Sequence, residues 1–114
     1  MQHLMCLNAQ PFERMESGEK TIELRLYDEK RRKIKMGDII RFQHKENETR
    51  VLTARVIALH VFSSFTKLYQ KLPLLRLGYT EQNVKNAVPK DMDEYYSKEE
   101  QKEYGVVGIE FELL

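Results

Sequence analysis

The sequence predicts an α+β fold: a small, mainly antiparallel sheet that curls into a partly closed β-barrel, with helices across its openings. Segments in which polar and apolar residues alternate, as in half-buried strands, recur along the chain and end it. Segments with the helical spacing of apolar residues fall between these strands. The chain has 114 residues, 41% of them hydrophobic, which suits one apolar core, so a single domain over residues 1–114 is expected.

The chain is expected to begin with a strand and a helix. Residues 3–7 are predicted to form a short buried strand in which Cys6 is a small hydrophobic residue. The next helix should end at Gly18, because glycine readily takes the positive φ that closes a helix. The residues that indicate this helix are the cap Asn8, the first-turn Pro11 and the buried pair Phe12 and Met15.

A second strand should follow Thr21, because apolar and polar residues alternate there. Its apolar face would hold Ile22, Leu24 and Leu26, and its polar face Thr21, Glu23 and Arg25, with Lys20 at its start. Asp28 is placed to cap a short basic helical turn. Residues 36–38 then form a turn and residues 39–44 a strand. After a polar turn at 46–48, residues 51–62 are rich in β-branched residues, which predicts a central strand buried on both faces.

The second half is predicted to be helical until its last strand. Ser63 or Ser64 caps a helix with an apolar stripe, and Pro73 ends it. Residues 74–79 are an apolar connection, and a short helix is expected from Thr80 to residue 88. Residues 97–100 match a capping box, which predicts a third helix that ends at Gly105. Residues 106–114 alternate again as the last strand. The stripe of the first of these helices is Phe65, Leu68, Tyr69 and Leu72.

The charge and the composition exclude several classes of site. The formal net charge is +1, so a site for a polyanion must be a local cluster, and the run Lys30, Arg31, Arg32, Lys33 and Lys35 is one. A single cysteine excludes an internal disulfide and a multi-cysteine metal site, and the three histidines are scattered without metal-ligand spacing. No metal and no cofactor are expected. No stretch is long and apolar enough for a membrane span or a signal peptide, so a cytoplasmic protein is expected.

The polar face of the second strand is the candidate site. Lys20 and Arg25 offer donors to phosphate, and Glu23 can orient them or accept from a base. Alternating charges of this kind also occur on solvated edge strands, and both interpretations stay open. Tyrosines of the helical half, Tyr95 and Tyr96 among them, would offer stacking surfaces to unpaired bases or would be core residues with a wet tip.

The octapeptide that begins at Gly18 reads G-x-K-x-x-E-x-R, and related residues follow at 26–32, 34–42 and 95–109. In these features the chain resembles the ASCH domains, a branch of the PUA-like superfamily. The resemblance implies a small β-barrel with helices that border a cleft, into which Lys20, Glu23 and Arg25 project. It also implies RNA or a nucleotide as the ligand, with Lys30, Arg31, Arg32, Tyr95 and Tyr96 as further binding candidates.

The resemblance leaves the activity open. Some similar proteins are reported as ribonucleases, and one bacterial branch hydrolyses an acetylated cytidine with the motif lysine and a threonine. This chain has Glu23 in place of that threonine, and Thr21 does not match it. The alternatives are therefore an RNA- or nucleotide-binding protein, a hydrolase in which Lys20 is the catalytic candidate, and an interaction protein whose helical half docks a partner.

Overall fold

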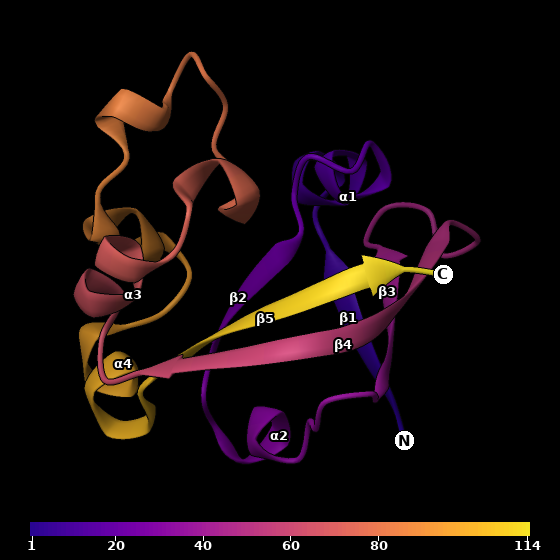
Figure 1. The fold of residues 1–114 in the computed structure, drawn as a ribbon, viewed down its shortest axis with the longest axis horizontal. Helices are drawn as coiled ribbons and strands as arrows, with labels where there is room; N and C mark the ends of the chain where they lie inside the picture. Colours follow the sequence, from indigo (N-terminus) through magenta and orange to yellow (C-terminus); the bar gives the residue numbers. More distant parts are fainter.

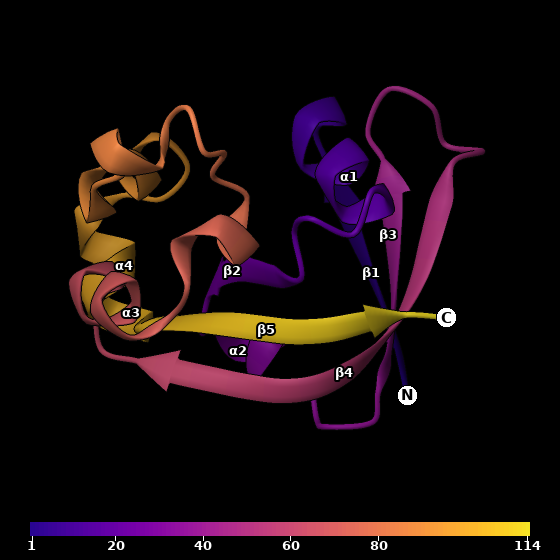
Figure 2. The ribbon, with the colours of Figure 1, turned by 45° about the horizontal axis from the view of Figure 1, so that its top comes forward.

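A computed structural model describes residues 1–114, and its centre is one five-stranded sheet with the strand order β1-β3-β4-β5-β2. The strands are β1 (Gln2–Leu7), β2 (Ile22–Leu26), β3 (Ile39–His44), β4 (Val51–Phe62) and β5 (Val106–Leu113). β1 and β3 pair in parallel, and the other pairs are antiparallel. The sheet curls into a half-barrel (Figures 1 and 2), which confirms the predicted α+β architecture.

Most helices lie on either side of β2, and one short helix lies in the connection between β2 and β3. The α-helices are α1 (Ala9–Glu16), α2 (Glu29–Arg32), α3 (Phe65–Lys71) and α4 (Lys98–Tyr104), and three short 3-10 helices are η1 (Leu74–Leu77), η2 (Val84–Asn86) and η3 (Pro89–Glu94). Figures 1 and 2 show α3, α4 and the segment between them as one group beside β2, with α1 on the other side. None of these helices has the length and the apolar character that crossing a membrane requires.

The apolar side chains form two clusters that share the sheet. One lies inside the curl, where Phe12 and Met15 of α1 pack on Ile40 and Phe42 of β3. The other joins β2 to the helical half, and its members include Ile22, Leu24, Leu26, Phe65, Leu68 and Val106. The alternation predicted for β2 is therefore confirmed for its apolar residues, because all three are buried against the helical group.

Two predicted burial patterns are wrong. β1 is not buried throughout, because Leu4 is 50% exposed and Cys6 is exposed as well. An edge strand of a curled sheet keeps one face outside, so only every second residue of β1 is covered. β4 does lie in the middle of the sheet, but Arg55 and Ile57 on its outer face are exposed. Its β-branched residues reflect strand propensity and not burial on both faces.

Most of the predicted helix caps are confirmed, with one exception: Asn8 stands at the start of α1, but its side chain makes no capping hydrogen bond. Asp28, Ser64 and Ser97 each accept a hydrogen bond from the backbone of their own helix. The helix predicted from Thr80 is wrong, because only the 3-10 turn η2 forms there. Thr80 and Asn83 do exchange side-chain hydrogen bonds with each other's N–H groups, as at a helix start, but Ala87 and Val88 are extended, as proline disfavours helical backbone in the residue before it. η3 begins at Pro89, where a break was expected, since proline is tolerated in a first turn.

Candidate functional site

The turn between α1 and β2 places Lys20 at the start of the polar face of β2. Gly18 has a φ of 85°, and the N–H groups of Glu19 and Lys20 both donate to the Arg14 carbonyl at 3.0 Å. This glycine turn ends α1 and reverses the chain within a few residues. Lys20 therefore lies just before β2, and its side chain is on the same side as that of Glu23.

Lys20, Glu23 and Arg25 form a connected and largely buried row. The Lys20 ammonium lies 3.3 Å from Glu23 Oε1, and Arg25 Nε donates to Glu23 Oε2 at 2.9 Å. Lys20 and Glu23 are each only 6% exposed. Arg25 Nη2 then reaches the Cys6 carbonyl of β1 at 3.3 Å, across the open side of the half-barrel. The interpretation as a solvated charged face is therefore wrong for this row.

The charges in the row act on one another. Burial lowers the pKa of Lys20, and Glu23 raises it only in part, while Arg25 and Arg14 lower it further. Burial raises the pKa of Glu23, but Lys20 and Arg25 outweigh burial and bring that pKa below its ordinary value. Glu23 is thus held as a carboxylate by two cations, and Lys20 gives up its proton more easily than a surface lysine does.

A cavity of about 470 Å³ opens above this row. One wall comes from the row itself, the start of α1 and the end of β1, where Cys6 lies. The opposite wall comes from the helical group. The residues that this second wall contributes are Tyr69, Leu77, Gly78, Tyr79, Asn83, Asp91, Met92, Glu94, Tyr95 and Tyr96.

The tyrosines of the helical wall have different surroundings. Tyr95 is 62% exposed, so most of its ring is open to solvent at the cavity. Tyr96 stacks on Phe65 at 6.2 Å between ring centroids, which occupies one face of its ring. Tyr79 donates to Asp91 at 2.7 Å and shares a second hydrogen bond of 2.7 Å with the Tyr69 hydroxyl. Burial and both hydrogen bonds raise the pKa of Tyr79, which keeps it neutral.

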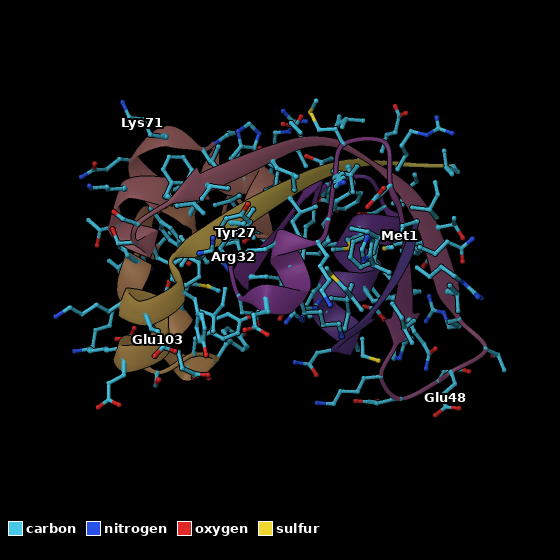
Figure 3. All side chains as sticks on the ribbon, turned by 90° about the horizontal axis from the view of Figure 1, so that it is seen from below. Met1, Tyr27, Arg32, Glu48, Lys71 and Glu103 are labelled. Atoms are coloured by element: carbon cyan, nitrogen blue, oxygen red, sulfur yellow. The ribbon has the colours of Figure 1, made fainter.

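The basic run on α2 does not line the cavity. Arg31 pairs with Asp28 at 3.1 Å, and Arg32 donates to the carbonyls of Tyr27 and Tyr104. Figure 3 shows Arg32 beside Tyr27, where its guanidinium lies 4.3 Å from the ring centroid. Lys30 is exposed. Burial raises the pKa of Tyr96 in the cavity wall, and the charges of Arg25 and Arg31 counter this in part.

Several residues of the site were not singled out from the sequence. The Leu77 carbonyl accepts from Lys20 Nζ at 2.7 Å, and Arg14 lines the cavity with an Nε that lacks a partner. A backbone carbonyl leaves no sequence signal, and Arg14 looks like any basic residue in a last helical turn. Asp91 also lines the cavity, but it lies far from Lys20 in the sequence, and no sequence pattern indicated that the two come together. Thr21 does not line the cavity, and its hydroxyl accepts from Arg76 at 2.8 Å.

Each of the three histidines has its own hydrogen-bond partner, and the three lie apart in the sequence. His3 lies 2.8 Å from Asp38, His60 lies 2.9 Å from Glu110, and His44 accepts from the Glu46 N–H. No group of three or more His, Cys, Asp or Glu side chains is arranged to hold a metal ion.

The comparisons with known proteins agree with the overall fold. A family model described as the ASCH domain matches residues 5–114. The crystal structure of hypothetical protein PH0355 is similar over 100% of both chains, with 36% identity and a TM-score of 0.82. The solution structure of protein PF0455 from Pyrococcus furiosus is 35% identical, with a TM-score of 0.74, over 100% of this chain and 98% of that one. No curated protein matches the sequence.

Proposed function

This chain belongs to the ASCH domain family, and from that premise we propose that its cavity binds RNA or a nucleotide. The observation that supports the proposal most is the buried row of Lys20, Glu23 and Arg25 along one wall of a cavity of about 470 Å³. Cavities of roughly 300 to 1,000 Å³ suit small organic ligands, so one nucleotide fits and a longer strand must run outside.

The proposed roles follow from the donor groups and ring faces that each side chain leaves free for a ligand. Arg25 keeps its Nη1 donors for a phosphate or a base edge, because Glu23 engages Nε and the Cys6 carbonyl engages Nη2. The open ring of Tyr95 would stack on a base at the cavity mouth. Lys30, with the exposed Lys33 and Lys35 beyond it, would follow the backbone of an RNA strand electrostatically. A cytoplasmic location belongs to the same proposal.

Titration of the four ribonucleoside monophosphates and of short single-stranded oligonucleotides at low salt tests this function. Arg25→Gln should weaken binding at least about tenfold, because a hydrogen bond to a charged group contributes about 1.5 to 3 kcal/mol. Arg55→Gln is the matched control, since Arg55 lies exposed on the outer face of β4. A wild-type affinity weaker than about 0.1 mM, or equal losses in the two variants, would contradict the proposal.

A second candidate is a hydrolase that acts on RNA or on an acylated cytidine, with Lys20 as its base. Burial lowers the pKa of Lys20, which favours such a role, whereas Glu23 at 3.3 Å raises that pKa and opposes it. Incubation with labelled RNA and with a panel of acylated cytidines tests it. Turnover should appear in the wild type and vanish in Lys20→Ala; turnover that persists in Lys20→Ala would count against a catalytic Lys20.

A further inference from the structure

Residues 77–79, here called the strap, belong to the helical wall of the cavity and contact the opposite wall at Lys20 and Arg14. The Leu77 carbonyl accepts from Lys20 Nζ at 2.7 Å, and the Tyr79 carbonyl accepts from Arg14 Nη2 at a longer 3.4 Å. Gly78 between them has a φ of 120°, and a Cβ on it would lie 3.5 Å from Lys20 Cδ. The strap thus packs along the Lys20 side chain and supplies one of its hydrogen-bond acceptors.

The contacts of Lys20 show how the strap can orient its ammonium group. An ammonium group has three N–H donors. The Leu77 carbonyl accepts one of them at 2.7 Å, and the Glu23 carboxylate lies 3.3 Å away as an ion-pair partner, while Lys20 also lines the cavity. The hydrogen bond to Leu77 and the attraction of Glu23 together orient the ammonium, and with it the free N–H that a ligand in the cavity would meet. A shift of the Leu77 carbonyl would therefore turn the free donor away from its ligand.

The residue before the strap is held by the backbone, because the Arg76 carbonyl accepts from the Thr21 N–H at 3.0 Å, and beyond Leu77 the strap depends on side chains. Gly78 and Tyr79 take part in no hydrogen bond between backbone groups. The Tyr79 hydroxyl instead donates to Asp91 of η3 and meets the hydroxyl of Tyr69 on α3, both at 2.7 Å. Asp91 is itself fixed by the Val88 N–H at 3.2 Å. The phenol thus ties the strap to two separate helices.

We propose that Tyr79 is a positioning residue, which holds the strap so that the free N–H of Lys20 points at the bound nucleotide. The nucleotide in this statement rests on the function proposed above, whereas the control of Lys20 by Tyr79 does not. The competing explanation is apolar packing, because Leu77 is buried and the rings of Tyr69 and Tyr79 meet edge to face at 6.0 Å. Packing alone would hold the strap without the hydroxyl.

Tyr79→Phe separates the two explanations, since it removes both hydrogen bonds and keeps the ring. The first measurement is an NMR titration of the Lys20 side chain, which needs no ligand. Loss of the hydroxyl should let water reach Lys20 and move its titration upward, toward that of an ordinary lysine. Tyr104→Phe is the matched control, because Tyr104 lies on α4 and does not line the cavity. An unchanged Lys20 titration in Tyr79→Phe would overturn the proposal.

The second measurement is the affinity for the ribonucleoside monophosphates in wild type, Tyr79→Phe, Lys20→Met and the double variant. Tyr79→Phe should weaken binding about threefold to tenfold in the wild-type background and much less in Lys20→Met, because its effect passes through Lys20. An equal loss in both backgrounds would mean that Tyr79 acts on the ligand without Lys20, and would refute the positioning role.

Two further outcomes are covered by the same set of variants. If the wild type binds no monophosphate, the proposed function fails, and the Lys20 titration alone decides whether Tyr79 controls Lys20. If Tyr79→Phe does not fold, Asp91→Asn replaces it, because it weakens the same tie and leaves the phenol in place. Asp91→Asn should then move the Lys20 titration in the same direction, and an unmoved titration refutes the proposal.

Discussion

Glu23 is the residue on which the charges of the cavity depend. Its two oxygens face Lys20 and Arg25, so removal of the carboxylate would leave two buried cations beside each other. Breaking a buried ion pair by removing one partner costs about 3 to 5 kcal/mol. Glu23 therefore couples the stability of the fold to the charge state of the site, which a residue on a solvated face would not do.

The pH dependence of stability should reveal this coupling. Because Lys20 and Arg25 bring the folded-state pKa of Glu23 below its ordinary value of 4.5, the carboxylate stabilises the protein above about pH 4.5. That stabilisation is lost as the pH falls through the folded-state pKa. Denaturant unfolding of Glu23→Gln should thus show a shallower decline below pH 4.5 than the wild type. The exposed Glu112 gives the control, Glu112→Gln, and identical slopes in all three proteins would contradict the prediction.

Tyr95 offers a test of binding that leaves the fold untouched. Since its ring is mostly exposed, Tyr95→Ala should change the free energy of unfolding by less than about 0.5 kcal/mol. Stacking of a base on an aromatic ring contributes about 1 to 3 kcal/mol, so oligonucleotide affinity should fall at least about fivefold. Fluorescence anisotropy with a labelled single-stranded RNA measures this, and an unchanged affinity would remove Tyr95 from the site.

Among the elements, α4 is a case in which local sequence determines local structure. The Ser97 hydroxyl accepts from the Glu100 N–H at 3.1 Å, and the Glu100 carboxylate accepts from the Ser97 N–H at 3.3 Å. Ser97→Ala should lower the free energy of unfolding by about 1 kcal/mol, as measured by urea unfolding. Nucleotide affinity should stay constant, because α4 does not line the cavity. Ser63→Ala, at an exposed serine beside a different helix, should have no effect on stability; a loss as large as that of Ser97→Ala would refute the capping role.

The elements also show how far the sequence alone leads. Caps such as Ser97, glycine turns such as Gly18 and the alternation in β2 were predictable, because each depends on residues a few positions apart. The row of Lys20, Glu23 and Arg25 was predictable as a shared strand face for the same reason. The contact of Lys20 with Leu77 was not, because it joins residues far apart in the chain through a backbone carbonyl.

At the scale of the whole molecule, the placement of the basic run outside the cavity matters for longer ligands. Lys30 and Lys33 of the α2 region are exposed and border a second hollow with Tyr104. If a bound RNA strand passes over these lysines, Lys30→Ala/Lys33→Ala should reduce the salt dependence of oligonucleotide binding. The slope of log affinity against log salt concentration should fall by up to about 1.4 for two lost phosphate contacts. Monophosphate binding should not change. Lys67→Ala/Lys71→Ala removes the same charge from α3, and an equal change in slope there would contradict a defined path.

The order of the strands in the sheet has a consequence for how the protein folds during synthesis. β5 lies between β4 and β2, so residues 22–26 find their partners only at residues 106–110. Contacts this far apart in sequence carry a large loop-closure entropy and slow the folding of a chain. During synthesis, β2 must wait, unpaired, until residues 106–110 have left the ribosome. The cavity beside β2 therefore forms late, and a chain halted before residue 106 lacks the strand that completes its wall.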